Sequence, residues 1–230
     1  EKRNLQAGPD GKVAVFTNGI FNDQEAAAGY SAQMSEVPAD QPIYLIHFPE
    51  ADNAVSELLV AGYQKFMEND FWGLANATKE TRNAMERFGN DGLYLSGHSR
   101  GAMTIGNAAT SLSRRNTQGE QLRETRFRLV GPAYNAQDLA NRVDDMNGDA
   151  PTQMELQNHE DDLVGSIIGG NEATYTHRPK NSSRLKEWVR MFGEAPTVHS
   201  CYGNGAMSVD GCNARYGQPT TILVPPSKSN

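Results

Sequence analysis

A serine stands between two glycines where a short apolar run gives way to a run with helical spacing. The segment reads Gly97-His98-Ser99-Arg100-Gly101, a G-x-S-x-G pattern that follows the apolar residues 93–96. A tight strand-to-helix turn of this kind strains the serine backbone and lifts its hydroxyl above the sheet, and glycines on both sides avoid a clash. The pattern predicts that Ser99 is a nucleophile. His98 cannot reach the serine hydroxyl in such a turn, so we interpret it as a packed or hydrogen-bonded side chain.

The backbone amides at the start of the following helix would point to the place where an oxyanion forms. We expect the Arg100 amide to be the first donor. A second donor should come from the loop after the first strand, where Asn18-Gly19-Ile20 follows the β-rich residues 12–17. The Ile20 amide is our candidate, although the same residues also fit a plain Asn-Gly turn.

A serine hydroxyl becomes a good nucleophile only when a histidine takes its proton, and a carboxylate must orient that histidine. In the strand-turn-helix setting of Ser99, the acid and then the histidine should follow the serine in the chain. His199 enters a Gly-rich loop after a short apolar stretch, as expected for a base that follows a late strand. His177 precedes a proline in a segment typical of a surface loop, and it is the alternative base.

The acid is expected in the segment MELQNHEDDLVG, where Glu160, Asp161 and Asp162 follow a strand-like run. The carboxyl ends of parallel strands are where ligands and catalytic groups gather. We choose Asp162, because it begins the next apolar segment and can turn back across the strand end; Asp161 is an alternative. Asp144 and Asp145, after the preceding strand, are further alternatives. Their segment lacks the spacing of a calcium loop, so we assign no metal and no cofactor.

The elements that must position these residues alternate between strand and helix. Apolar, β-rich runs are followed by helical patterns in a regular order that is typical of right-handed βαβ crossovers. We therefore predict an α/β fold with a mostly parallel sheet flanked by helices and a helical insertion before the strand of Ser99. The predicted strands are residues 12–17, 42–48, 93–96, 126–130 and 153–157, and the predicted helices are residues 22–33, 53–88 in two pieces, 101–112, 136–143 and 183–192.

The bulk composition fits one soluble domain over residues 1–230, with a core at about 12–202 and an irregular segment at about 203–230. The formal net charge of -7 disfavours nucleic acid as a ligand, because such binding depends on neutralising phosphates. No apolar run is long enough to span a membrane, and the first residues lack the features of an export signal. Cys201 and Cys212 fit a disulfide and two free thiols equally well.

The ordered set of Asn18-Gly19, the Ser99 turn, Asp162-Leu163-Val164 and His199-Ser200 resembles the α/β-hydrolase superfamily, particularly its lipase-like members. The resemblance covers residues 12–202 and implies a Ser99, Asp162 and His199 triad. The segments TNGIFND, IHFPEA, LLVAGYQKF and GLYLSGHSRGAMTIGNA also resemble C-terminal toxin domains of filamentous-haemagglutinin and contact-dependent growth inhibition proteins. That resemblance implies delivery from a larger, secreted or cell-surface bacterial protein into a target cell, and a cognate immunity protein. It would also account for a chain that starts without Met.

The expected substrate is a lipid or another carboxylic ester. Aromatic residues between the second and third predicted strands would line an acyl-chain pocket or meet a membrane, although such a stripe more often belongs to a core; they are Tyr63, Phe66, Met67, Phe71 and Trp72. Two alternatives remain. One is an inactive hydrolase relative that binds a partner, and the other is a nuclease toxin, against which the acidic balance argues.

Overall fold

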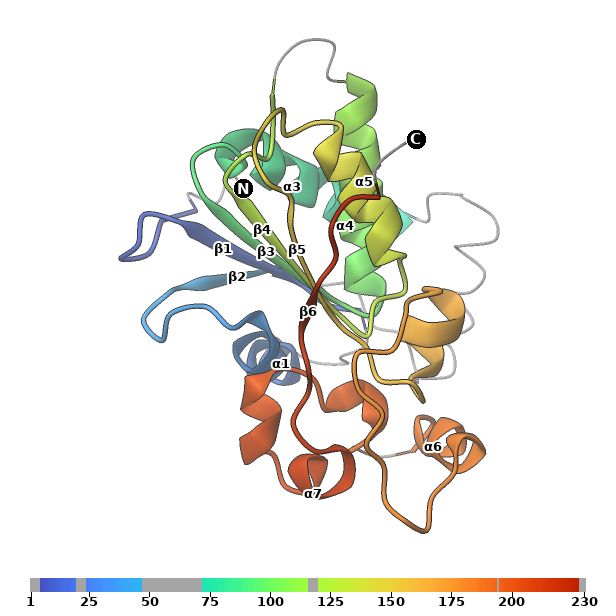
Figure 1. The fold of residues 1–230 in the computed structure, drawn as a ribbon. Coiled ribbons are helices and arrows are strands. Elements are labelled where there is room, and N and C mark those ends of the chain that lie inside the picture. Colours follow the sequence, from blue (N-terminus) through green and yellow to red (C-terminus); the bar gives the residue numbers. More distant parts are fainter. Residues whose placement is uncertain (1–4, 20–23, 47–71, 116–119, 194, 228–230) are drawn as a thin grey trace.

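A six-stranded sheet forms the centre of the computed structural model, which describes residues 5–19, 24–46, 72–115, 120–193 and 195–227 (Figure 1). The strands lie in the order β2-β1-β3-β4-β5-β6. Their bounds are β1 Val13–Thr17, β2 Ile43–Ile46, β3 Leu93–His98, β4 Thr125–Val130, β5 Gln153–Gln157 and β6 Ile222–Leu223. Strand β2 lies at one edge of the sheet, and β6, the last strand in the chain, lies at the other edge beside β5.

Strands β1 to β5 run parallel, and β6 runs antiparallel to β5. The register pairs Thr17 of β1 with Gly97 of β3, and His98 of β3 with Val130 of β4. The carboxyl ends of the five parallel strands, β1 to β5, therefore lie at the same edge of the sheet. From β1 the chain crosses to β2 on one side of it, and then returns to the other side of β1 as β3. The strand order therefore reverses between β1 and β3. Open α/β sheets bind ligands at such a reversal.

Helices cover both faces of the sheet. One face carries α3 (Trp72–Phe88), α4 (Arg100–Arg115) and α5 (Ala136–Asp144), whereas the other carries α1 (Gln24–Ser35) and C-terminal elements (Figure 1). The shorter elements are the π-helix η1 (Leu163–Ile168), α6 (Arg184–Arg190), the 3-10 helices η2 (Val198–Ser200) and η3 (Asn204–Ser208), and α7 (Cys212–Tyr216). These short elements follow β5 and surround the carboxyl edge of the sheet.

Two apolar clusters hold these layers together. The first joins the buried residues of the central strands, such as Leu95 and Phe127, to α3, α4 and α5 through side chains such as Ile105 and Leu139. The second, on the other face, contains Phe16 of β1 and Met34 of α1 with residues of the C-terminal segment. Strands buried on both faces explain why the apolar runs of the sequence show little alternation.

The predicted α/β architecture with a mostly parallel sheet is confirmed, with one correction at the C-terminus. Residues 203–227 are not irregular, because they contain η3, α7 and the edge strand β6. Cys212 and Tyr216 are buried in the second apolar cluster, and Leu156 of β5 pairs with Ile222. Of the predicted helical residues 53–88, residues 72–88 form α3, which begins at Trp72 of the aromatic stripe. The rest of the predicted insertion, with Tyr63, Phe66, Met67 and Phe71, lies outside the described residues, and β2 is described only to Ile46.

Candidate active site

Ser99 occupies a sharp turn between β3 and α4. Its φ of 55° lies in the left-handed region, which costs a residue with a side chain on the order of 1–3 kcal/mol. The glycines of the motif make room for this turn: a Cβ on Gly97 would lie 2.9 Å from the Ala102 nitrogen, and one on Gly101 would lie 2.0 Å from the Thr17 oxygen. The G-x-S-x-G pattern is thus required by close backbone approaches on both sides of the serine.

The loop after β1 lies directly against this turn. The Thr17 hydroxyl donates to the Gly101 carbonyl at 2.9 Å. A Cβ on Gly19 would lie 2.7 Å from the nitrogen of Arg100, the first residue of α4. The predicted oxyanion donor Arg100 and the predicted donor loop are therefore adjacent. Ile20, the specific residue proposed for the second donor, lies outside the described residues.

His199 and Asp162 form a buried hydrogen-bonded pair. Nδ1 of His199 lies 2.7 Å from Oδ2 of Asp162, and their side chains are 7% and 0% exposed. An ionised carboxylate only accepts hydrogen bonds, so the pair places the imidazole proton on Nδ1 and leaves the lone pair on Nε2. Nε2 of His199 is buried and has no hydrogen-bond partner within the described parts of the chain. This nitrogen is therefore free to accept a proton.

Asp162 receives four hydrogen bonds in the interior. Its Oδ1 accepts from the backbone amides of Val164 and Gly165 at the start of η1, at 2.9 and 3.4 Å, and its Oδ2 accepts from His199 and from the Tyr202 hydroxyl at 2.6 Å. Burial alone would raise the pKa of the Asp162 carboxyl, but His199 and the Tyr202 hydrogen bond outweigh it and lower this pKa below its ordinary value. The carboxylate is thus ionised at neutral pH.

The segment after β4 connects the Ser99 turn to this pair. Ser99 donates its backbone amide to the Val130 carbonyl at 3.3 Å, and its own carbonyl accepts from the Ala133 amide at 3.0 Å. Between them, Gly131 has a φ of 50°, and a Cβ there would lie 2.6 Å from Oδ2 of Asp162 and 3.1 Å from Nδ1 of His199. One short segment therefore contacts both the serine backbone and the His199 and Asp162 side chains.

His98 makes a second connection between the Ser99 turn and His199. Its ring lies 4.4 Å from the ring of His199, between centroids, and its Nε2 donates to the His199 carbonyl at 2.8 Å. Burial, followed by the charge of His199, lowers the pKa of His98 to about 3, so this side chain is neutral over the physiological range. His98 is the packed, hydrogen-bonded neighbour that its position in the motif predicts.

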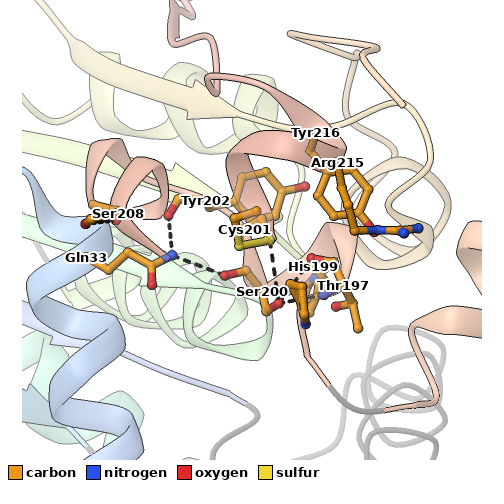
Figure 2. Close-up of a disulfide and its surroundings, with 12 residues drawn as sticks. Gln33, Thr197, His199, Ser200, Cys201, Tyr202, Ser208, Arg215 and Tyr216 are labelled. Atoms are coloured by element: carbon orange, nitrogen blue, oxygen red, sulfur yellow. Dashed lines mark hydrogen bonds between the residues drawn. A yellow bond between two sulfur atoms is a disulfide. The ribbon is translucent and has the colours of Figure 1, made fainter. Parts of the chain in front are cut away.

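A disulfide and a glutamine side chain also hold the loop that carries His199 (Figure 2). Cys201 and Cys212 form a disulfide that joins the loop to α7. From α1, Nε2 of Gln33 donates to the carbonyls of Ser200 and Tyr202, at 3.1 and 2.7 Å. Together with the His98 contact, these bonds hold the backbone on both sides of the imidazole and so restrict the orientation of His199.

The alternative acid next to Asp162 has a different set of partners. Asp161 is fully buried, and its carboxylate accepts from Arg178 at 3.0 Å and from Arg184 at 3.2 Å. Glu160 binds the same two arginines. The side chains of these adjacent acids point in different directions: Asp162 binds His199, whereas Glu160 and Asp161 bind arginines.

The remaining alternatives lie away from the pair. The exposed side chain of His177 packs beside Gly217, and its carbonyl binds Nε2 of His159 at 2.7 Å. Asp144 ends α5 and accepts from the Thr152 hydroxyl, which precedes β5, and Asp145 follows it. Because Thr152 leads into the amino end of β5, Asp144 and Asp145 lie at the edge of the sheet opposite Ser99.

Sequence reasoning missed Tyr202 and Gly131. Tyr202 is fully buried, and burial and the charge of Asp162 raise the pKa of its hydroxyl well above its ordinary value, so that it remains a donor. Its only signal in the sequence is its place three residues after His199. Gly131 could have been found, since Gly131-Pro132 ends a predicted strand.

Within the described residues, no group of three or more His, Cys, Asp or Glu side chains is arranged to hold a metal ion. No described helix has the length and apolar character to cross a membrane. The chain matches no protein-family model, and no curated protein and no solved structure matches it. The chemistry of the site is accordingly inferred from its own residues.

Proposed function

We propose that the protein is a serine hydrolase that cleaves carboxylic esters with Ser99 as nucleophile, His199 as base and Asp162 as the acid that orients it. The observation that carries this proposal is the buried His199–Asp162 pair, with Nε2 unbonded, beside a serine in a strained strand-to-helix turn. Strain at one residue is maintained only where the surrounding structure enforces it, and it is concentrated at functional sites. The order of the three residues in the chain agrees with that of the α/β-hydrolase superfamily.

In the proposed reaction, Nε2 of His199 takes the Ser99 hydroxyl proton as the serine oxygen attacks the ester carbonyl carbon. The ionised Asp162 stabilises the imidazolium that results. The oxyanion would be held by the Arg100 amide at the start of α4 and by an amide of the loop after Gly19, for which Ile20 is the candidate. In this structure Nε2 of His199 accepts no hydrogen bond from the Ser99 hydroxyl. We expect this bond to form when substrate enters, because catalytic hydrogen bonds often tighten only in the complex with substrate.

The imidazolium then gives its proton to the departing alcohol, and an acyl-serine ester remains. A water molecule, deprotonated by the same Nε2, attacks that ester and releases the carboxylic acid and free Ser99. No cofactor is needed to balance either half of the reaction. Asp162 and Tyr202 do not exchange protons in this scheme, because one stays ionised and the other stays protonated.

The substrate class that we favour is a lipid or phospholipid ester. The resemblance of the chain to toxin domains of contact-dependent growth inhibition proteins supports a role as an effector, delivered as part of a larger bacterial protein to a target cell and neutralised by an immunity protein. A nuclease activity is less well supported, since acidic residues outnumber basic ones, 28 to 21.

The test is labelling by a fluorophosphonate probe, read by intact mass. We expect one adduct on the wild-type chain and none on Ser99→Ala. Labelling should also fall strongly in His199→Ala, because the serine is activated by that base. If the wild-type chain takes no adduct, whether short-chain esters are present or absent, Ser99 is not an activated nucleophile. The protein is then better described as a binding module with a hydrolase-like site.

A further inference from the structure

Helix α6 presents an apolar face to solvent. Leu185, Val189 and Phe192 are 67%, 65% and 44% exposed. Spacings of four and three residues place these side chains on one side of the helix and of the turn that follows it. The other side, with Glu187 and Met191, is buried against the body of the protein. Exposed apolar side chains gathered on one face mark an interaction surface more often than scattered ones do.

The same segment is rich in basic residues, of which Arg178 and Arg184 form ion pairs with Glu160 and Asp161. Residues 178–192 contain five Lys or Arg residues and a single acidic residue, Glu187. Glu187 is buried and binds Tyr216 and Arg215, so it contributes little negative charge to the surface. Lys186 donates to the backbone carbonyl of Asn181, and Arg190 to that of Pro196, and within the described residues neither forms an ion pair with a carboxylate. The exposed Lys186 charge is therefore left to act outward, whereas the charge of Arg190 also helps to lower the pKa of the buried Glu187 carboxyl.

This face lies beside the candidate active site. Arg184, the first residue of α6, binds the carboxylate of Asp161, which precedes Asp162. At the other end, Nε of Arg190 donates at 3.0 Å to the carbonyl of Pro196, three residues before His199. Figure 1 shows α6 at the outer edge of the molecule. The helix thus stands next to the segments that carry the acid and the base, with its apolar face turned away from the sheet.

We propose that the α6 face, made of Leu185, Val189 and Phe192 with the basic residues Lys180 and Lys186, docks on a membrane surface of anionic phospholipids. Apolar side chains would enter the boundary between headgroups and acyl chains, while the lysines bind headgroup phosphates. An acidic chain is repelled by such a surface unless a locally basic segment faces it, and α6 provides that segment. Where the proposed ester hydrolysis also holds, docking here presents membrane lipids to the Ser99 side of the protein.

The experiment is co-sedimentation of the Ser99→Ala chain with lipid vesicles, so that binding is measured without catalysis. We expect binding to vesicles of phosphatidylcholine with phosphatidylglycerol, much weaker binding to phosphatidylcholine alone, and loss of binding in high salt. In this background, Leu185→Glu/Val189→Glu should lower the partition coefficient at least about tenfold, because two apolar side chains are no longer buried. Lys180→Glu/Lys186→Glu should lower it about tenfold or more.

Leu223→Glu and Lys79→Glu are the matched controls, since Leu223 is 71% exposed on β6 and Lys79 is exposed on α3, both outside α6. Both should bind vesicles like the parent. The proposal is overturned if the parent does not bind anionic vesicles, or if the α6 variants bind as well as these controls; a protein partner would then be the occupant. In parallel, Leu185→Glu/Val189→Glu is made in a chain that retains Ser99, and its labelling by the fluorophosphonate probe should equal that of the wild type. If neither this variant nor the wild type is labelled, the proposed hydrolase function is refuted and the docking result still stands.

Discussion

The Tyr202 hydroxyl donates a 2.6 Å hydrogen bond to Oδ2 of Asp162, the same oxygen that accepts from Nδ1 of His199. The tyrosine oxygen in turn accepts the backbone amide of His159 at 3.1 Å. Two donors on one carboxylate oxygen restrict the position of Asp162 more than a single donor would, and hydrogen bonds to a charged group are among the stronger ones. We therefore expect Tyr202 to position the proposed base His199 through Asp162, without touching substrate.

Tyr202→Phe should lower the plateau value of kcat for ester hydrolysis about tenfold, since a bond to a charged group is worth about 1.5–3 kcal/mol. Without this donor the carboxylate becomes more basic and stabilises the imidazolium, so the acid limb of the kcat/KM profile should move to higher pH. The measurement is a pH–rate profile of both chains. A purely structural role would lower stability and leave the limb in place.

Tyr175→Phe is the matched control for this change. Tyr175 is buried with its ring against Tyr202 and His159, but its hydroxyl has no hydrogen-bond partner within the described residues. Removal of that hydroxyl leaves no group unpaired, so kcat and the acid limb should stay as in the wild type. Equal profiles for Tyr202→Phe and Tyr175→Phe would contradict the positioning role.

Ser99→Ala, His199→Ala and Asp162→Asn should each remove most of the ester hydrolysis, by about 10⁶-fold for the serine and the histidine and about 10⁴-fold for the aspartate, and double variants should lose little more than the serine or histidine variant alone. The reason is that each residue acts only through the other two. Steady-state kinetics on a soluble short-chain ester measures this. His177→Ala, with its exposed side chain, should retain wild-type activity. If His177→Ala were inactive and His199→Ala active, the base would be misassigned.

The disulfide between Cys201 and Cys212 should stabilise the protein by roughly 3 kcal/mol, as expected when a loop of this sequence separation, 11 residues, is closed in the unfolded chain. Cys201→Ser/Cys212→Ser should therefore unfold at lower urea concentration than the oxidised wild type. Activity well below the transition should be reduced only in part, because Gln33 and His98 also hold the loop. Addition of a reductant should lower the wild-type midpoint and leave that of the double-serine variant unchanged; a reductant-insensitive wild type would argue against the bond.

Local patterns in the sequence were sufficient to predict the five parallel strands of the sheet and the Ser99 turn. Glycines flanking a serine between an apolar run and a helical run have a physical cause in the backbone approaches at Gly97 and Gly101. Strand β6 could not be predicted in this way. It is two residues long, and what makes Ile222 and Leu223 a strand is the pairing with β5, some 65 residues earlier in the chain.

The choice of acid shows a second limit. Asp161 and Asp162 are adjacent and of one residue type, so spacing alone does not separate them. Their roles differ because Arg178 and Arg184, which follow 17 and 23 residues after Asp161, bind that carboxylate. Tyr202 was missed for the same reason, since its contact with Asp162 spans 40 residues. Contacts between distant segments decide these roles, and a single sequence does not contain them.

The buried ring of His98 makes the fold sensitive to acid. Its pKa is about 3 in the folded chain and near 6.5 in the unfolded chain, so between these values the unfolded chain binds a proton that the folded chain does not. The free energy of unfolding therefore rises with pH between about 3 and 6.5. As the pH falls below about 6.5, the protein loses stability at up to about 1.4 kcal/mol per pH unit. The lowered pKa of Asp162 acts in the same direction, but only below its ordinary value of 3.8.

His98→Gln should flatten this dependence, because the amide nitrogen of glutamine can still donate to the His199 carbonyl but does not titrate. Urea unfolding at pH 7.0, 6.0 and 5.0 should show the wild type losing up to about 2 kcal/mol more than the variant over this range. His98→Leu serves as the control: it should share the flatter slope but be less stable at every pH, since the donor to His199 is gone. Parallel slopes for the wild type and both variants would mean that the protonation of another group, and not of His98, governs acid unfolding.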